Sequence, residues 1–254
     1  MPSHFSSIGF PIGGREDFEK LALQVVNEGQ SVQSPRGSYF YLRAERAELW
    51  ASLTPDRELI GVAPHFAGSA VMRVGLTSRL ESPDMEGLEG SFYGWADPAG
   101  GDYENTGAYP FVFEAIAFAT QAQLQLPALV EVQLTAFAHE LTAYSSEAAF
   151  DEAQGQNEAK FAPQSFFPTS LFQSQSEGEI PEAYAMFYGH VRETARLVNS
   201  FTQQPYHWAK VETLGGEIDV VADPQVLQGD LAVGGVVSVY GWLSGRIVRK
   251  VQLN

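Results

Sequence analysis

The stretch from Ala185 to Val251 constrains the fold more than any other part of the chain. Its residues alternate between apolar and polar in short runs, and Gly and Pro stand between the runs. This pattern is typical of antiparallel strands that are joined by hairpin turns. We expect five strands, with a non-strand insert after the third and a turn at Gly245; they cover residues 186–199, 206–213, 217–222, 236–243 and 247–251.

The order of these strands indicates a small barrel. The first run is long enough to bend at Gly189, and the phrase from Val233 to Gly245 looks like a closing hairpin. In these features the block resembles the five-stranded OB-fold barrel. The chain is similar in this respect to uncharacterised bacterial proteins with an OB-fold-like C-terminal domain. The resemblance implies a barrel of the kind that often binds oligonucleotides or oligosaccharides, although a fold does not carry a function with it.

The whole chain predicts a β-rich α+β protein with three regions. Residues 1–80 form a small α/β region, which begins with a short strand at residues 5–12. Residues 81–182 form an antiparallel β region with a short helix and a Phe-rich connecting segment. Residues 183–254 form the OB-like β-barrel. Whether residues 1–182 make one domain or two is left open.

Three elements outside the barrel are clear. A helix from Arg15 to Glu28 places Phe18 and other apolar residues on one stripe, and Gly29 ends it. The longest strand runs from Ala128 to Tyr144 and has one apolar face and one mostly polar face. A short helix follows from Ser145 to Gln154, capped by Ser145 or Ser146.

The N-terminal order of elements carries a second resemblance. A β-α-β-β-β order with His4 just before its first strand resembles half of a vicinal-oxygen-chelate enzyme of the glyoxalase type. That resemblance implies a metal ion bound by His and Glu side chains. The alternative function is therefore a metal-dependent enzyme whose ligands are drawn from His4 or His65 and a carboxylate such as Glu131 or Glu114.

Charge and composition limit the classes of partner that the chain can bind. The net charge is −16, whereas residues 185–254 hold six basic and six acidic residues. A strongly acidic chain is a poor binder of nucleic acid, because phosphate neutralisation dominates that affinity. The chain has no Cys, which excludes disulfides and thiolate metal sites. It shows neither a secretion signal nor an apolar run of membrane-spanning length, so we expect a cytoplasmic protein without a membrane partner.

The C-terminal block holds the residues that favour ligand binding. Aromatic rings beside cations are suited to binding a ligand by stacking. The first hypothesis is thus a non-catalytic binding or interaction protein that uses one aromatic face of the barrel: Tyr188, His190, Arg192, Trp208, Lys210 and Trp242. The alternative is that Trp208 and Trp242 fill the barrel or its contact with the first region.

A third hypothesis concerns the Phe-rich segment at residues 161–172. A disordered linker rarely carries so much apolar surface, so the segment either packs on the protein itself or docks a partner chain. No nucleotide-binding loop, hydrolase elbow or zinc-helix motif is present, and we predict no cofactor. The expected partner is an unidentified small ligand or protein, and a homo-oligomer is left open.

Overall fold

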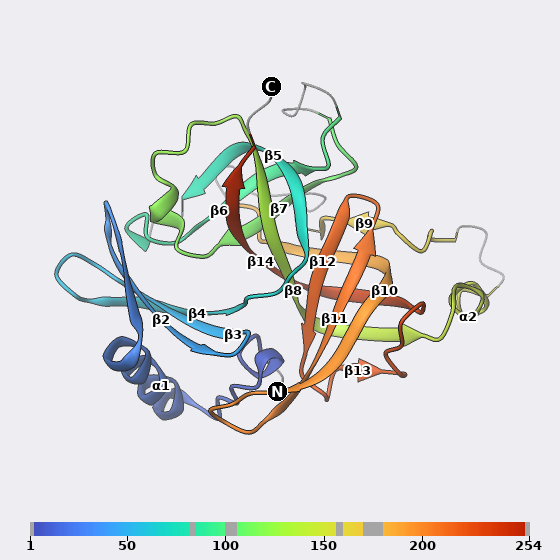
Figure 1. The fold of residues 1–254 in the computed structure, drawn as a ribbon, viewed down its shortest axis with the longest axis horizontal. Coiled ribbons are helices and arrows are strands. Elements are labelled where there is room, and N and C mark those ends of the chain that lie inside the picture. Colours follow the sequence, from blue (N-terminus) through green and yellow to red (C-terminus); the bar gives the residue numbers. More distant parts are fainter. Residues whose placement is uncertain (1–2, 82–84, 100–105, 156–159, 170–179, 252–254) are drawn as a thin grey trace.

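The computed structural model describes residues 3–81, 85–99, 106–155, 160–169 and 180–251. It confirms a β-rich α+β protein, with a small antiparallel sheet near the N-terminus and a large mixed sheet (Figure 1). None of the helices in the described ranges is long and apolar enough to span a membrane.

The N-terminal sheet carries the predicted helix. Its four strands pair in chain order: β1 (Gln30–Ser34), β2 (Gly37–Ala44), β3 (Ala47–Leu53) and β4 (Leu59–Phe66). Helix α1 (Arg15–Glu28) lies along this sheet in Figure 1 and buries Ala22 and Val25 from the predicted apolar stripe. The strand expected at residues 5–12 was wrong, because a single 3-10 turn, η1 (Ser6–Ile8), stands there.

The larger sheet contains the remaining strands: β5 (Val71–Glu81), β6 (Gly90–Ala96), β7 (Pro110–Ala115), β8 (Ala128–Tyr144), β9 (Phe166–Phe167), β10 (Tyr184–Val198), β11 (Pro205–Thr213), β12 (Gly216–Ala222), β13 (Leu227–Gln228) and β14 (Val236–Lys250). Two of them are long and antiparallel to each other, since β14 pairs with β8 from Val236 opposite Tyr144 to Lys250 opposite Val130.

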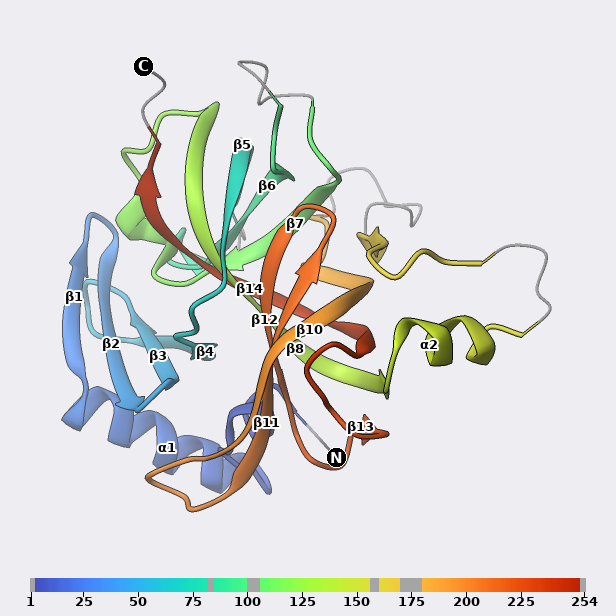
Figure 2. The ribbon, with the colours of Figure 1, turned by 45° about the vertical axis from the view of Figure 1, so that its right-hand side comes forward.

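The pairs around β8 and β14 close two rings of strands. In the first ring β5, β6 and β7 connect the N-terminal half of β8 to the C-terminal half of β14. In the second ring β12, β11 and β10 connect the other halves of the same two strands. Figure 2 shows β8 and β14 running between the two groups of strands. Both faces of β8 are therefore buried over most of its length, including the face that we expected to be polar.

The predicted OB-like barrel within residues 183–254 is not confirmed. The expected turn at Gly245 is absent, and the run 247–251 continues β14 without a break as far as Lys250. Glycine at position 245 is explained by packing instead of a turn, because a Cβ there would lie 2.6 Å from the ring of Phe113. The strand that closes the second ring is β8, which precedes the C-terminal block in the sequence.

One large apolar core joins η1, α1 and both sheets. Helix α2 (Glu147–Ala153) lies outside it and is capped as predicted, since the Ser146 hydroxyl accepts from the Ala149 N–H at 3.1 Å. The Phe-rich segment is described only to residue 169, so Leu171 and Phe172 lie outside the described residues. Phe166 stacks on Tyr109 with 3.9 Å between ring centroids, which anchors this part of the segment to the core.

Candidate functional site

Two histidines from opposite parts of the sequence meet at one point. The Nε2 atoms of His4 and His139 lie 2.7 Å apart, although 135 residues separate them in the chain. His4 precedes η1 and is half-buried, whereas His139 is exposed on β8. Burial, and next the neighbouring His139, lower the pKa of His4 to about 4, and burial also lowers the pKa of His139. Both imidazoles are consequently neutral at pH 7.

A β-bulge places His139. Across β8 and β14, Tyr240 lies opposite Glu140 and Gly241 lies opposite Ala138, so His139 is the extra residue on β8. A bulge bends its strand and re-aims a side chain. Gly241 permits the bulge, because a Cβ there would lie 2.5 Å from the Phe137 carbonyl oxygen.

Aromatic rings hold the two imidazoles. His4 stacks on Trp242 with 4.5 Å between ring centroids and 12° between ring planes. His139 meets Tyr184 and Tyr240 edge-on, and the Tyr184 hydroxyl lies 3.5 Å from His4 Nε2. We call this set the imidazole cluster: His4, His139, Tyr184, Tyr240 and Trp242.

Trp242 connects the imidazole cluster to a group of carboxylates. Its indole Nε1–H donates a 2.7 Å hydrogen bond to Glu114 Oε1 on β7. Part of Glu114 is open to solvent, but protein atoms crowd the carboxylate. This desolvation is the main reason why the pKa of Glu114 is raised, and the nearby Glu89 and Glu182 raise it further. The hydrogen bond from Trp242 acts in the opposite direction and lowers it. Burial also raises the pKa of Glu89, against a hydrogen bond from Ser52.

These carboxylates line one cleft, which we call the carboxylate cleft. It has a volume of about 370 Å³ and lies between the starts of β6 and β10 and the strand β7. Glu89, Glu114, Glu182 and Tyr184 are among its lining residues. Glu89 and Glu114 also line a second cavity of about 30 Å³ beside Tyr39, Trp50 and Trp242, which is about the room one water molecule needs.

The structure does not arrange the predicted aromatic residues as one exposed face. Tyr188, Trp208 and Trp242 keep only 9%, 5% and 4% of their surface exposed. Tyr188 packs against Phe150 of α2, whereas Trp208 packs against Phe66 of β4. A stacking platform requires open rings, so these burials favour the alternative in which the tryptophans fill the interior.

The predicted polar members of that face lie in separate local contacts. Arg192 forms an ion pair with Glu212, and Lys210 forms one with Glu193 at 2.6 Å. His190 Nε2 lies 4.0 Å from a carboxylate oxygen of Glu147, the first residue of α2. Each contact is accounted for without a ligand.

The alternative metal ligands are not assembled. His65 is wholly buried in β4, and its Nδ1 lies 3.3 Å from Ser244 Oγ. Glu131 forms an ion pair with Arg249 at 2.6 Å. Across the described ranges, no group of three or more His, Cys, Asp or Glu residues is placed to hold a metal ion.

Trp208 belongs to a buried polar group. Its Nε1–H donates to Asp219 Oδ1 at 2.8 Å, and Asp219 Oδ2 accepts from the Ala70 N–H at 2.9 Å and from Gln133 Nε2 at 3.3 Å. Asp219 has no exposed surface, and this burial raises its pKa. The group satisfies a buried carboxylate, which is a structural role.

The carboxylate cleft and the imidazole cluster are thus the candidate site, and sequence reasoning identified only some of its residues. His4, Glu114 and Trp242 were singled out, but for different partners. Glu89, Glu182 and Tyr184 carried no signal, because the pairing of β6, β7, β10 and β14 brings them together. Comparison with protein-family models, curated proteins and solved structures finds no match for this chain.

Proposed function

We propose that the protein binds a small organic cation, such as a primary amine, in the carboxylate cleft. The observation that carries this proposal is that Glu89 and Glu114 line one cleft while burial raises the pKa of each. Carboxylates that repel each other in a desolvated place favour a positive guest, because the guest relieves both the repulsion and the burial of charge.

The surroundings of the cleft agree with such a ligand. Among the described residues, no ion pair includes Glu89 or Glu114, so no basic side chain neutralises them. Tyr184 lines the cleft, which gives an organic cation an aromatic ring to contact, and Trp242 holds Glu114 by its hydrogen bond. The volume of about 370 Å³ lies within the range of small-molecule sites.

Isothermal titration calorimetry tests the proposal with putrescine and tyramine as probes, in buffer that contains EDTA. Butanediol and ethylphenol are the matched neutral compounds. We expect the amines to bind and the neutral compounds to fail. Because binding favours the ionised carboxylates, the amines should release protons at mildly acidic pH, which calorimetry in buffers of different ionisation enthalpy measures.

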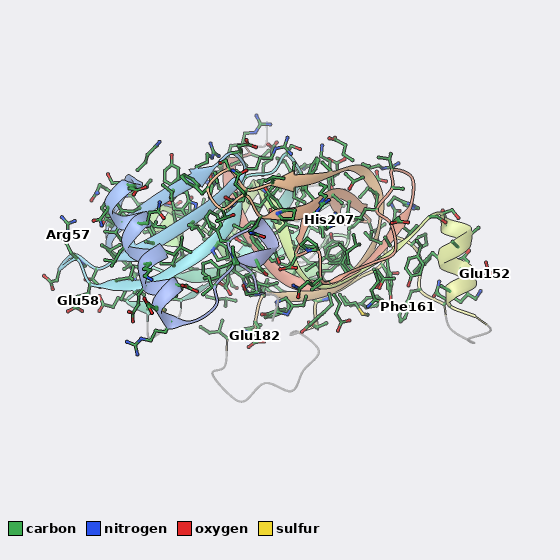
Figure 3. All side chains as sticks on the ribbon, turned by 90° about the horizontal axis from the view of Figure 1, so that it is seen from below. Arg57, Glu58, Glu152, Phe161, Glu182 and His207 are labelled. Carbon is green, nitrogen blue, oxygen red and sulfur yellow. The ribbon has the colours of Figure 1, made fainter. Side chains whose placement is uncertain are left out.

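Variants locate the binding site. Glu114→Gln keeps the shape of the side chain and removes its charge, and we expect it to weaken amine binding at least about tenfold, or 1.4 kcal/mol. Glu58→Gln removes the same charge from an exposed residue that Figure 3 places at one end of the molecule, away from Glu182. Equal affinities for amines and neutral compounds, or equal effects of the two variants, would contradict the proposal.

A further inference from the structure

The imidazole cluster has a feature that an amine site does not explain. His4 and His139 point the same ring nitrogen, Nε2, at each other across 2.7 Å. Two uncharged imidazoles in this arrangement share one proton position, so at least one of the two facing nitrogens presents a lone pair. Neutral imidazole nitrogen is a preferred ligand of divalent transition ions.

We propose that His4 and His139 bind a zinc ion through their Nε2 atoms, with the remaining positions open to water or to a small ligand. The proposal does not depend on amine binding in the carboxylate cleft. A zinc ion with Zn–N bonds of about 2.0–2.1 Å in tetrahedral geometry holds its two nitrogens about 3.3 Å apart. The two Nε2 atoms, now 2.7 Å apart, must separate by about 0.6 Å to admit the ion. His139 is exposed, so its ring can make that movement toward solvent.

The protein holds the two rings in advance. The bulge in β8 projects His139 from the strand, and the stacking of His4 on Trp242 orients the second ring. Trp242 is itself held by its hydrogen bond to Glu114. Contacts of this kind around the ligands orient a metal site and contribute to its affinity.

The neighbouring groups suit a site with open positions. The Tyr184 hydroxyl lies 3.5 Å from His4 Nε2 and can donate a hydrogen bond to water on the ion. Glu140 follows His139 in the chain, and its charge acts on the His139 ring. With two protein ligands instead of the three that are usual at catalytic zinc, we expect moderate affinity.

Calorimetric titration with Zn²⁺ tests the proposal on the full chain, purified without a polyhistidine tag and stripped by a chelator. We expect one ion per chain, and at least a tenfold loss of affinity in His4→Ala and in His139→Ala. His207→Ala is the matched control, because His207 is half-buried on β11 and has no part in the cluster. His207→Ala should keep the wild-type affinity.

Tryptophan fluorescence gives a second measurement. Because Trp242 stacks on His4, Zn²⁺ should change its emission, and Trp242→Phe should remove that change while Trp95→Phe keeps it. His139 is exposed, so His139→Ala keeps the fold and remains informative even if His4→Ala unfolds. The absence of binding at millimolar Zn²⁺ would overturn the proposal. An affinity for Zn²⁺ that is unchanged in His139→Ala would also overturn it. If Glu114→Gln loses Zn²⁺ binding while His139→Ala keeps it, the ion lies in the carboxylate cleft and the proposal fails.

Discussion

Replacing Trp208 by Phe tests whether this residue serves the interior or a ligand. The change removes the Nε1–H that donates to Asp219 Oδ1 at 2.8 Å and keeps most of the apolar ring. A hydrogen bond to a charged group contributes about 1.5–3 kcal/mol. The smaller ring loses roughly a further 1 kcal/mol of packing against neighbours such as Phe66. We therefore expect Trp208→Phe to lower the free energy of unfolding by about 2.5–4 kcal/mol.

Urea unfolding measures this loss as a fall in the midpoint at an unchanged slope. Trp95→Phe is the matched control, since Trp95 is half-buried on β6 and its indole donates no hydrogen bond within the described part of the chain. The loss should also depend on pH. The Trp208 hydrogen bond lowers the pKa of Asp219, against the burial that raises it. Without that bond the charged carboxylate is less favourable, so the difference between variant and wild type should shrink as the pH falls and Asp219 becomes protonated.

Two results would refute this reasoning. The first is a Trp208→Phe midpoint equal to that of Trp95→Phe, which would mean that the indole–carboxylate bond contributes nothing. The second is a Trp208→Phe variant that is as stable as the wild type but no longer binds a ligand, which would mean that Trp208 belongs to the ligand site expected from the sequence.

Two further predictions concern a helix cap and a buried histidine. Ser146→Ala removes the side-chain acceptor of the Ala149 N–H and should destabilise α2 by about 0.5–2 kcal/mol. Hydrogen exchange at the Ala149 amide should become faster. An unchanged exchange rate would exclude the cap as the reason why the helix starts there. Burial holds the pKa of His65 well below its ordinary value. At mildly acidic pH the His65 imidazole therefore binds a proton in the unfolded chain but not in the folded chain. As the pH falls below about 6.5, the unfolding free energy should drop by up to about 1.4 kcal/mol per pH unit for this residue. His65→Gln, measured by urea unfolding across the same range, should show a shallower dependence, and an identical slope would contradict the assignment.

The sequence predicts well those elements whose cause is local. The stripe of apolar residues from Phe18 to Val26 specifies α1, and strict alternation gives β8 its observed bounds, Ala128–Tyr144. The cap at Ser146 is likewise a contact over three residues. In each case the residues that determine the element lie within a few positions of one another, so the local sequence pattern predicts the element.

The errors share a different cause. Gly245 was interpreted as a turn because Gly usually supplies turns, but here it makes room for Phe113 of a neighbouring strand. Alternation normally marks a strand with one buried face, whereas β8 lies in two rings and buries its mostly polar face as well. Each error depends on a strand that is distant in sequence, and no local pattern encodes that strand.

The candidate site follows from the same long-range pairing. Alternation along a regular strand would place His139 on one face with Glu131, at a distance that no single ion bridges. His139 shares its face with Phe137, and both rings contact His4 from the N-terminal segment, while the pairing of β10 with β14 sets Tyr184 opposite Trp242. The imidazole cluster therefore lies where β8, β10 and β14 adjoin, and Trp242 connects it to the carboxylate cleft between β6, β7 and β10. The carboxylate cleft needs side chains from both rings, and the imidazole cluster also needs His4 from the N-terminal segment. Binding at the imidazole cluster should accordingly protect the amide hydrogens of β8 and β14 more than those of β1 to β4.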